Sequence, residues 1–204
     1  MPTTVPQPAA TATATATPTS TRVKIPGEGG IWLLVFADLM VFTTLFAAFL
    51  YHRSENEALF ATQQAQLSQT AGAINTFLLL TSSLFVVAGV RAFERQRKVG
   101  AQWLFGGAML CGAGFAISKY IEYSDKVDHG LGPSTDVFFQ YYYLMTGLHF
   151  FHLTIGMGCL IYMILEARKP CTENRLSHVE SGATYWHMVD LLWIMLFALL
   201  YMVH

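Results

Sequence analysis

Five long apolar runs, separated by short polar connections, dominate the chain after its first 26 residues. Each run has about 20 residues or more, which as an α-helix is enough to cross a hydrocarbon core about 30 Å thick. The pattern predicts an all-α integral membrane protein, a bundle of five transmembrane helices. The runs are Gly30–Tyr51, Gly72–Phe93, Val99–Ser118, Val137–Leu165 and Ala183–Met202.

The segment before the first run, residues 1–26, consists mainly of Thr, Ala and Pro and alternates Thr with Ala from Thr11 to Thr17. Such a polar, repetitive tract cannot bury enough apolar surface to order itself. It also lacks the basic start and apolar middle of a secretory signal. We therefore expect a disordered Thr/Ala/Pro-rich tail at 1–26 and a single membrane domain at 27–204.

The composition agrees with a membrane protein, since 53% of the residues are hydrophobic and only 12% are charged. A soluble domain usually carries about twice that share of charge. The net charge of -1 gives no indication of a nucleic-acid partner. The three cysteines, Cys111, Cys159 and Cys171, show no CxxC spacing that would indicate zinc or a redox pair.

Lysines and arginines gather on alternate connections, as the positive-inside rule requires of a helical membrane protein. Few basic residues lie on the other side, where Arg53 and Lys126 stand out. The asymmetry predicts a cytoplasmic N-terminus and a periplasmic C-terminus, which suits an odd number of spans. The basic residues on the predicted cytoplasmic side are Arg22, Lys24, Arg91, Arg95, Arg97, Lys98, Arg168, Lys169 and Arg175.

Ionisable residues inside the apolar runs are the candidates for function, because such groups are costly at membrane depth. Asp38 lies two turns into the first run, and the fifth run carries His187 and Asp190 three residues apart. His149 and His152 show the same spacing near the middle of the fourth run, so each pair shares a helix face. Counted from the cytoplasmic side, Asp38 falls in the same layer as His187 and Asp190.

A second set of polar residues is expected to be structural. Lys119 and Glu122 lie one turn apart near the outer end of the third run, where a local ion pair and snorkelling would make them tolerable. Asn75 opens the second run, with Thr76 and three further hydroxyl residues behind it, and such side chains commonly bond across neighbouring membrane helices.

Three interpretations of the His and Asp residues remain open. A metal site is disfavoured, because only the pairs His149/His152 and His187/Asp190 are available and no HExxH or ExxH motif occurs. A buried hydrogen-bond cluster explains the same residues without a metal. Asp38 is the best candidate for proton transfer, and its structural alternative is a carboxylate bonded to His187 or a hydroxyl, joining the first and fifth helices.

Four motifs in register on successive helices resemble those of subunit III of the haem-copper oxidases. The resemblance covers the chain from Gly30 onward and adds Glu180 to the site residues. The motifs are Asn75-Thr76 with Leu78-Leu79-Leu80-Thr81-Ser82-Ser83, Lys119 with Glu122-Tyr123, Thr146-Gly147-x-His149-x-x-His152, and Glu180 with Tyr185-Trp186-His187-x-x-Asp190-x-x-Trp193.

Within that family, the chain resembles the short forms that lack the first two of seven helices. Asp38 then falls where the family carries a carbodiimide-reactive glutamate, and the change from Glu to Asp weakens the proton-related expectation. The segments Glu180–Ala183 and Trp186–Trp193 are similar in particular to NorE-type proteins, which are associated with bacterial nitric oxide reductase.

The resemblance implies a non-catalytic subunit of a respiratory electron-transport complex in the bacterial inner membrane, with no catalytic residue, metal or cofactor of its own. Haem and non-haem metal would lie in the partner, the catalytic subunit I, and phospholipid is the one further ligand suggested. NorE-like support of nitric oxide reductase in denitrification is the first expectation. The alternatives are subunit III of an aerobic cytochrome c or quinol oxidase, and a stand-alone proton-linked carrier. The absence of proline from all five runs argues against the carrier.

Overall fold

The computed structural model describes residues 29–202, which form helices joined by short connections. The tail predicted at residues 1–26 lies outside this range. The elements are α1 (Gly29–Glu55), α2 (Glu57–Gln64), α3 (Gln69–Glu94), α4 (Lys98–Asp128), α5 (Val137–Glu166), α6 (Glu173–Phe197) and the π-helical turn η1 (Ala198–Met202), which continues α6.

Within residues 29–202, five helices are long and apolar enough to cross a membrane, and they contain the five predicted runs. The predicted ends were wrong in two places, because α4 continues past Ser118 to Asp128 and α6 begins at Glu173 rather than Ala183. In both places the helical hydrogen bonds extend beyond the apolar residues into polar turns. Hydropathy locates the part of a helix that is in lipid, not the point where the backbone leaves the helix.

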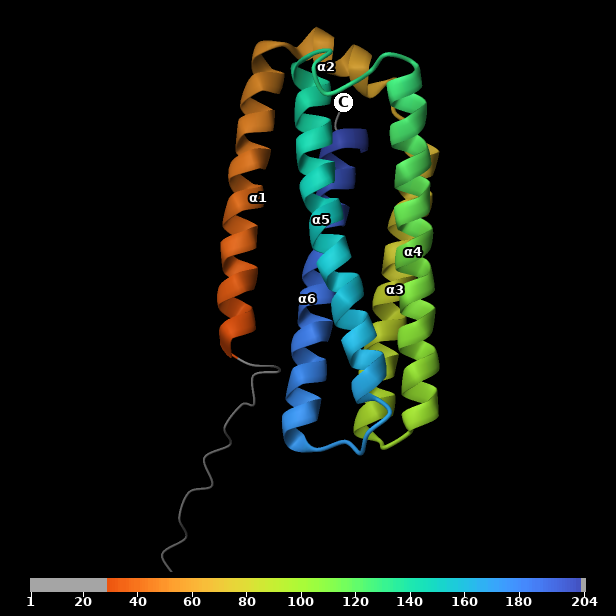
Figure 1. Ribbon diagram of the computed structural model, residues 1–204. Coiled ribbons are helices and arrows are strands. Elements are labelled where there is room, and N and C mark those ends of the chain that lie inside the picture. The colour runs from red at the N-terminus through yellow and green to blue at the C-terminus, as the bar shows by residue number, and fades with distance from the viewer. Residues whose placement is uncertain (1–28, 203–204) are drawn as a thin grey trace, which may run out of the picture.

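The short helix α2 was not predicted. It lies across one end of the bundle and connects α1 to α3 (Figure 1). Phe60 of α2 is fully buried, with its ring 5.3 Å from that of Phe49 on α1 and 5.6 Å from that of Phe138 on α5. Aromatic pairs at these separations are favourable, so α2 packs over the end of the α1–α5 interface.

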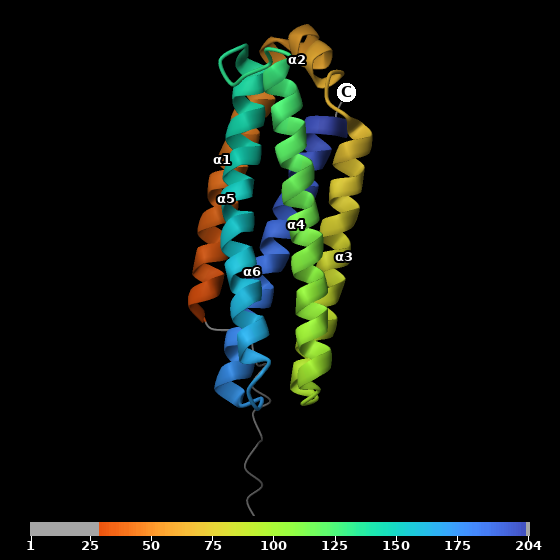
Figure 2. The ribbon, with the colours of Figure 1, turned by 45° about the vertical axis from the view of Figure 1, so that its right-hand side comes forward.

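Helices α3 to α6 form a four-helix bundle, in which α3 packs on α4 and α6, and α5 packs on α4 and α6. Helix α1 lies outside this bundle against α5 and α6, as Figures 1 and 2 show from two sides. It is the least buried of the five spans, with 11% of its most apolar window inside the protein, compared with 56% for α6. The polar core therefore lies among α3–α6, and α1 contributes to it from one side.

Successive long helices run in opposite directions, so each end of the bundle collects alternate connections (Figure 1). The start of α1, the α3–α4 turn and the α5–α6 connection lie at one end, which we call the basic end because it carries Arg91–Lys98 and Arg168–Arg175. Gln96, in the α3–α4 turn, bonds the backbone of Cys171 twice, at 3.0 and 3.1 Å. This amide fixes the two connections to each other.

Trp186 of α6 fills a slot between α4 and α5 that glycines make possible. A Cβ atom at Gly156 or at Gly112 would lie 2.9 Å from the Trp186 ring, which is too close for carbon atoms. Gly156 therefore permits close contact between α5 and α6. Gly147 and Gly158 of α5 play no such part, since nothing would lie within 4 Å of a Cβ at either position.

Candidate functional site

Buried polar residues lie in groups along the length of the bundle. One group, toward the end that carries α2, is built on Lys119, whose ammonium donates to Glu122 at 3.0 Å, Tyr201 at 2.8 Å and Tyr142 at 3.3 Å. Both tyrosine hydroxyls donate to the other oxygen of Glu122, at 2.6 and 2.7 Å. Trp193 covers the ammonium with its ring at 4.9 Å.

The predicted ion pair between Lys119 and Glu122 is confirmed, but the predicted snorkelling is wrong. Lys119 is only 2% exposed, because its three hydrogens find acceptors inside the bundle and it has no need to reach the interface. Tyr142 and Tyr201 were missed by sequence analysis. Both tyrosines are far from Glu122 in sequence, so spacing could not pair them with it. The one signal that could have indicated the contact is that all three residues fall near the same end of the predicted bundle.

The middle group contains His149 and Asn75, both completely buried. The His149 ring packs between Phe115 and Trp193, with centroids 5.6 and 5.2 Å away. Neither the ring nitrogens of His149 nor the amide atoms of Asn75 have a hydrogen-bond partner among residues 29–202. Three of the hydroxyl groups predicted on α3 do bond across helices. Thr76 accepts from Trp193 at 3.1 Å, Ser82 donates to the Ala108 carbonyl at 2.9 Å, and Ser83 pairs with His187 at 2.6 Å.

His187 and Asp190 form the third group with Ser83 of α3. Nδ1 of His187 lies 2.6 Å from the Ser83 hydroxyl and 4.0 Å from a carboxylate oxygen of Asp190. The Asp190 side chain is 5% exposed, whereas that of His187 is 36% exposed. The predicted pairing of these two residues on one face of the helix is confirmed, and the α3 hydroxyl completes it.

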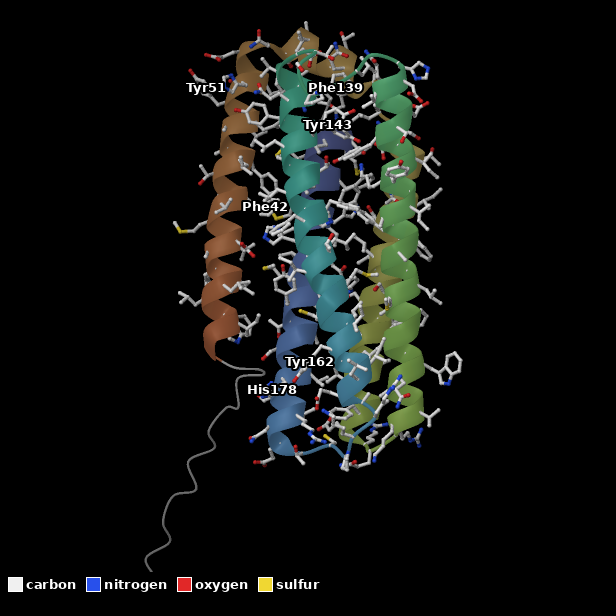
Figure 3. The ribbon with its side chains drawn as sticks, in the orientation of Figure 1. Phe42, Tyr51, Phe139, Tyr143, Tyr162 and His178 are labelled. Atoms are coloured by element: carbon white, nitrogen blue, oxygen red, sulfur yellow. The ribbon has the colours of Figure 1, made fainter. Side chains whose placement is uncertain are left out.

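Asp38 was expected to bond His187 or a hydroxyl, and its partner is instead His152 of α5. Oδ2 of Asp38 lies 3.3 Å from Nε2 of His152. Phe42, one turn further along α1, packs edge-on against the same imidazole at 5.7 Å and points from α1 toward α5 (Figure 3). Asp38 therefore joins α1 to α5 rather than to α6.

The second nitrogen of His152 determines what this pair can do. Nδ1 lies 2.8 Å from the carbonyl oxygen of Leu148, which can only accept, so Nδ1 carries a hydrogen. Nε2 is left to face the Asp38 carboxylate, so the ring is held on one side by the backbone of α5 and on the other by α1.

Glu180 lies in the part of α6 nearer the basic end, where its side chain is half-buried. It precedes His187 by two helical turns, which is about 10 Å along the axis. The structure thus does not place Glu180 in the layer of His187 and Asp190. Among residues 29–202, no group of three or more His, Cys, Asp or Glu side chains is arranged to hold a metal ion.

Comparison with known proteins identifies the family of the chain. The sequence model of the family "Cytochrome c oxidase subunit III" matches residues 11–204, nearly the whole chain. The chain belongs to this family. Subunit III proteins of this family lack redox centres and partner the catalytic subunit I of haem-copper oxidases.

The relatives in this family come from both cytochrome c and quinol oxidases. A cytochrome c oxidase subunit 3 from Synechocystis is 31% identical over 175 residues, covering 85% of this chain and 74% of that protein. The corresponding protein of Thermostichus vulcanus is 31% identical over 174 residues, covering 84% and 85%. A quinol oxidase subunit 3 from Bacillus subtilis is 29% identical over 176 residues, covering 85% of each.

Proposed function

We propose that this chain is the non-catalytic subunit III of an oxygen-reducing haem-copper oxidase, and that it binds and stabilises the catalytic subunit I. The observation that carries the proposal is the family match over residues 11–204, together with relatives named after cytochrome c and quinol oxidases. Haem and other redox metals then belong to the partner. Buried polar groups of this chain, such as Lys119 and Glu122, supply internal bonds of the bundle, and the contact of Asp38 with His152 joins α1 to it.

The proposed location is the inner membrane of a bacterium, with the basic end in the cytoplasm. The support is electrostatic, because basic connections are retained on the cytoplasmic side during insertion. The arrangement of the helices agrees with this orientation, since it brings the basic residues of both connections to the same end as the start of α1 (Figure 1).

The NorE-type specificity is the second candidate. Its support is the sequence from Glu180 to Trp193, and the relatives described above are all named as oxidase subunits. We therefore place an oxygen-reducing partner first and a nitric oxide reductase second.

The experiment is purification of the tagged full-length chain from its native membrane in mild detergent, followed by a haem spectrum and turnover with oxygen and with nitric oxide. We expect haem and oxygen consumption to copurify with the chain. Comparing reduced cytochrome c with a quinol as electron donor then identifies the oxidase type.

Two outcomes would change the conclusion. Haem b with nitric oxide consumption and no oxygen reduction would replace the oxidase by the NorE-type partner. Recovery of the chain without haem, under conditions that preserve other respiratory complexes, would contradict both candidates and favour a stand-alone membrane protein.

A further inference from the structure

His187 pairs with Ser83 of α3. Ser83 lies near the middle of the apolar run Gly72–Phe93, about 15 Å from either end, and His187 shares that depth. The imidazole is therefore at the centre of the hydrocarbon layer, where lipid tails offer no hydrogen-bonding group. More than a third of the side chain is nevertheless exposed, although the bond to Ser83 already fixes Nδ1 toward the bundle.

The face of α6 around His187 is not covered by the other helices within residues 29–202. Thr184, His187, Leu191, Ile194 and Ala198 follow the spacing of one helix face. Leu191 is 49% exposed and Ile194 is 38% exposed. The face runs for about 20 Å along α6, and α1 lies on one side of it and α3 on the other (Figure 1).

Toward the end that carries α2, this face widens into a groove of about 530 Å³ between α6 and α1. Its lining is apolar apart from Thr43. The α6 side contributes Ile194, Met195, Ala198 and Leu199, and the α1 side contributes Thr43, Phe46, Ala47 and Leu50. We call the groove and the α6 face below it the α1–α6 face.

We infer that the α1–α6 face receives a transmembrane helix of the catalytic subunit, and that this helix hydrogen-bonds Nε2 of His187 with a polar side chain at mid-membrane depth. The inference rests on the proposed function, because it names the surface through which the chain meets its partner. A polar group in hydrocarbon without a partner is costly. A neighbouring protein helix can supply the missing bond, and a lipid tail cannot.

The shape and chemistry of the surface narrow the description of the partner. A face of about 20 Å matches several turns of a helix, and its apolar flanks suit van der Waals packing between helices. The bonding group must reach a single imidazole nitrogen, as Ser, Thr, Asn or Gln side chains do between membrane helices. The helix that binds here is therefore apolar with one such residue at its centre.

Two variants separate binding from folding. His187→Phe keeps the ring volume and removes Nε2, whereas Ser83→Ala removes the inward bond and leaves Nε2 in place. We expect His187→Phe to weaken association with the haem-containing subunit about three- to twentyfold, as loss of one membrane hydrogen bond does. Ser83→Ala should retain the partner. Equal retention by both variants, or equal loss, would overturn the assignment of Nε2 to the interface.

Photo-crosslinking tests the same face without altering His187. A photoreactive residue at Leu191 should form a product with the catalytic subunit in native membranes, whereas one at Leu110, on the far side of the bundle in α4, should not. A product with a second copy of this chain, or with lipid only, would overturn the inference. If the wild-type chain recovers no haem protein, the proposed function fails first. If it recovers one and Leu191 does not crosslink to it, this inference alone fails.

Discussion

Lys119 and Glu122 carry opposite charges in the interior of the bundle and leave no polar atom of the pair unpaired. The ammonium has three acceptors, and the carboxylate accepts from the ammonium and two tyrosines. A buried pair of this kind pays a desolvation cost that nearly cancels its attraction, so its main effect is on specificity of packing. Here it fixes α4, α5 and η1 relative to one another.

The first prediction follows from that balance. Lys119→Met should lower the free energy of unfolding by about 3–5 kcal/mol, because it leaves the Glu122 charge buried without a cation. Adding Glu122→Leu should restore most of the loss. Unfolding by denaturing detergent in micelles measures both. Lys169→Met is the control. Lys169 pairs with Glu166 at 2.7 Å, but its side chain is half exposed, so the pair stabilises the protein by about 1 kcal/mol or less. A double variant as unstable as Lys119→Met would contradict this account.

The second prediction concerns the contact between Asp38 and His152. Asp38→Asn removes the carboxylate charge but keeps a polar side chain of the same size, so the contact between α1 and α5 should persist. We expect the assembled complex to form normally, with a changed pH dependence of turnover. Ring nitrogen NMR shifts of His152 should change in the variant, because the carboxylate that faces Nε2 becomes an amide. Unchanged turnover and unchanged pH dependence in the assembled complex would remove Asp38 from any proton-related role.

Sequence spacing predicted those site contacts that lie within one helix and missed those that depend on tertiary structure. A separation of three residues suffices to pair Lys119 with Glu122 and His187 with Asp190. It cannot reveal Tyr201, which is 82 residues from Lys119, or choose His152 over His187 as the partner of Asp38. Those choices depend on the rotation and axial position of whole helices, which many weak packing contacts decide together.

At the scale of the helices, close packing depends on small residues facing one large ring. Trp186 has no exposed surface, because Gly112 on α4 and Gly156 on α5 allow both helices to approach it. The five spans were predictable from hydropathy, since the apolar stretches exceed the membrane thickness, but the helix ends at Asp128 and Glu173 were not. Helix α2 was not, because its eight residues are stabilised by burial of Phe60 rather than by a pattern of their own.

The third prediction tests that slot. Gly156→Ala should destabilise the bundle by about 1–3 kcal/mol, the usual cost of overpacking, because the new methyl group would meet the Trp186 ring. Gly147→Ala is the matched control on the same helix, and it should be neutral or slightly stabilising, since its Cβ meets no atom within 4 Å. Thermal unfolding of the two variants in the same detergent measures the difference. Equal melting temperatures would show that the slot tolerates a methyl group.

At the scale of the whole molecule, the chain combines a four-helix bundle that holds its polar groups inside with an outer helix that is held by fewer contacts. Helix α1 is attached through α2, through the Phe49 and Phe60 rings, and through Asp38. Charge is distributed along the same axis, because the basic connections gather at the end where α1 starts. That asymmetry could be predicted from sequence. The peripheral position of α1 also left a signal there, since its span has a mean hydropathy of 2.3 and the other four spans have values of 1.4 to 1.9.

The fourth prediction is the orientation of this axis. In a cysteine-free background, Arg95→Cys should react with a membrane-impermeant maleimide only after permeabilisation, while His129→Cys and Ser54→Cys should react in intact cells. The native thiols are removed because Cys171 also lies at the basic end. Burial, and the nearby carboxylates of Glu94 and Glu180, raise the pKa of the Cys171 thiol, so less of it is the reactive thiolate at neutral pH. If Cys171 were kept, it would react slowly with the maleimide from the basic end and add to the labelling of Arg95→Cys. Labelling of Arg95→Cys in intact cells would reverse the proposed topology and place the basic end in the periplasm.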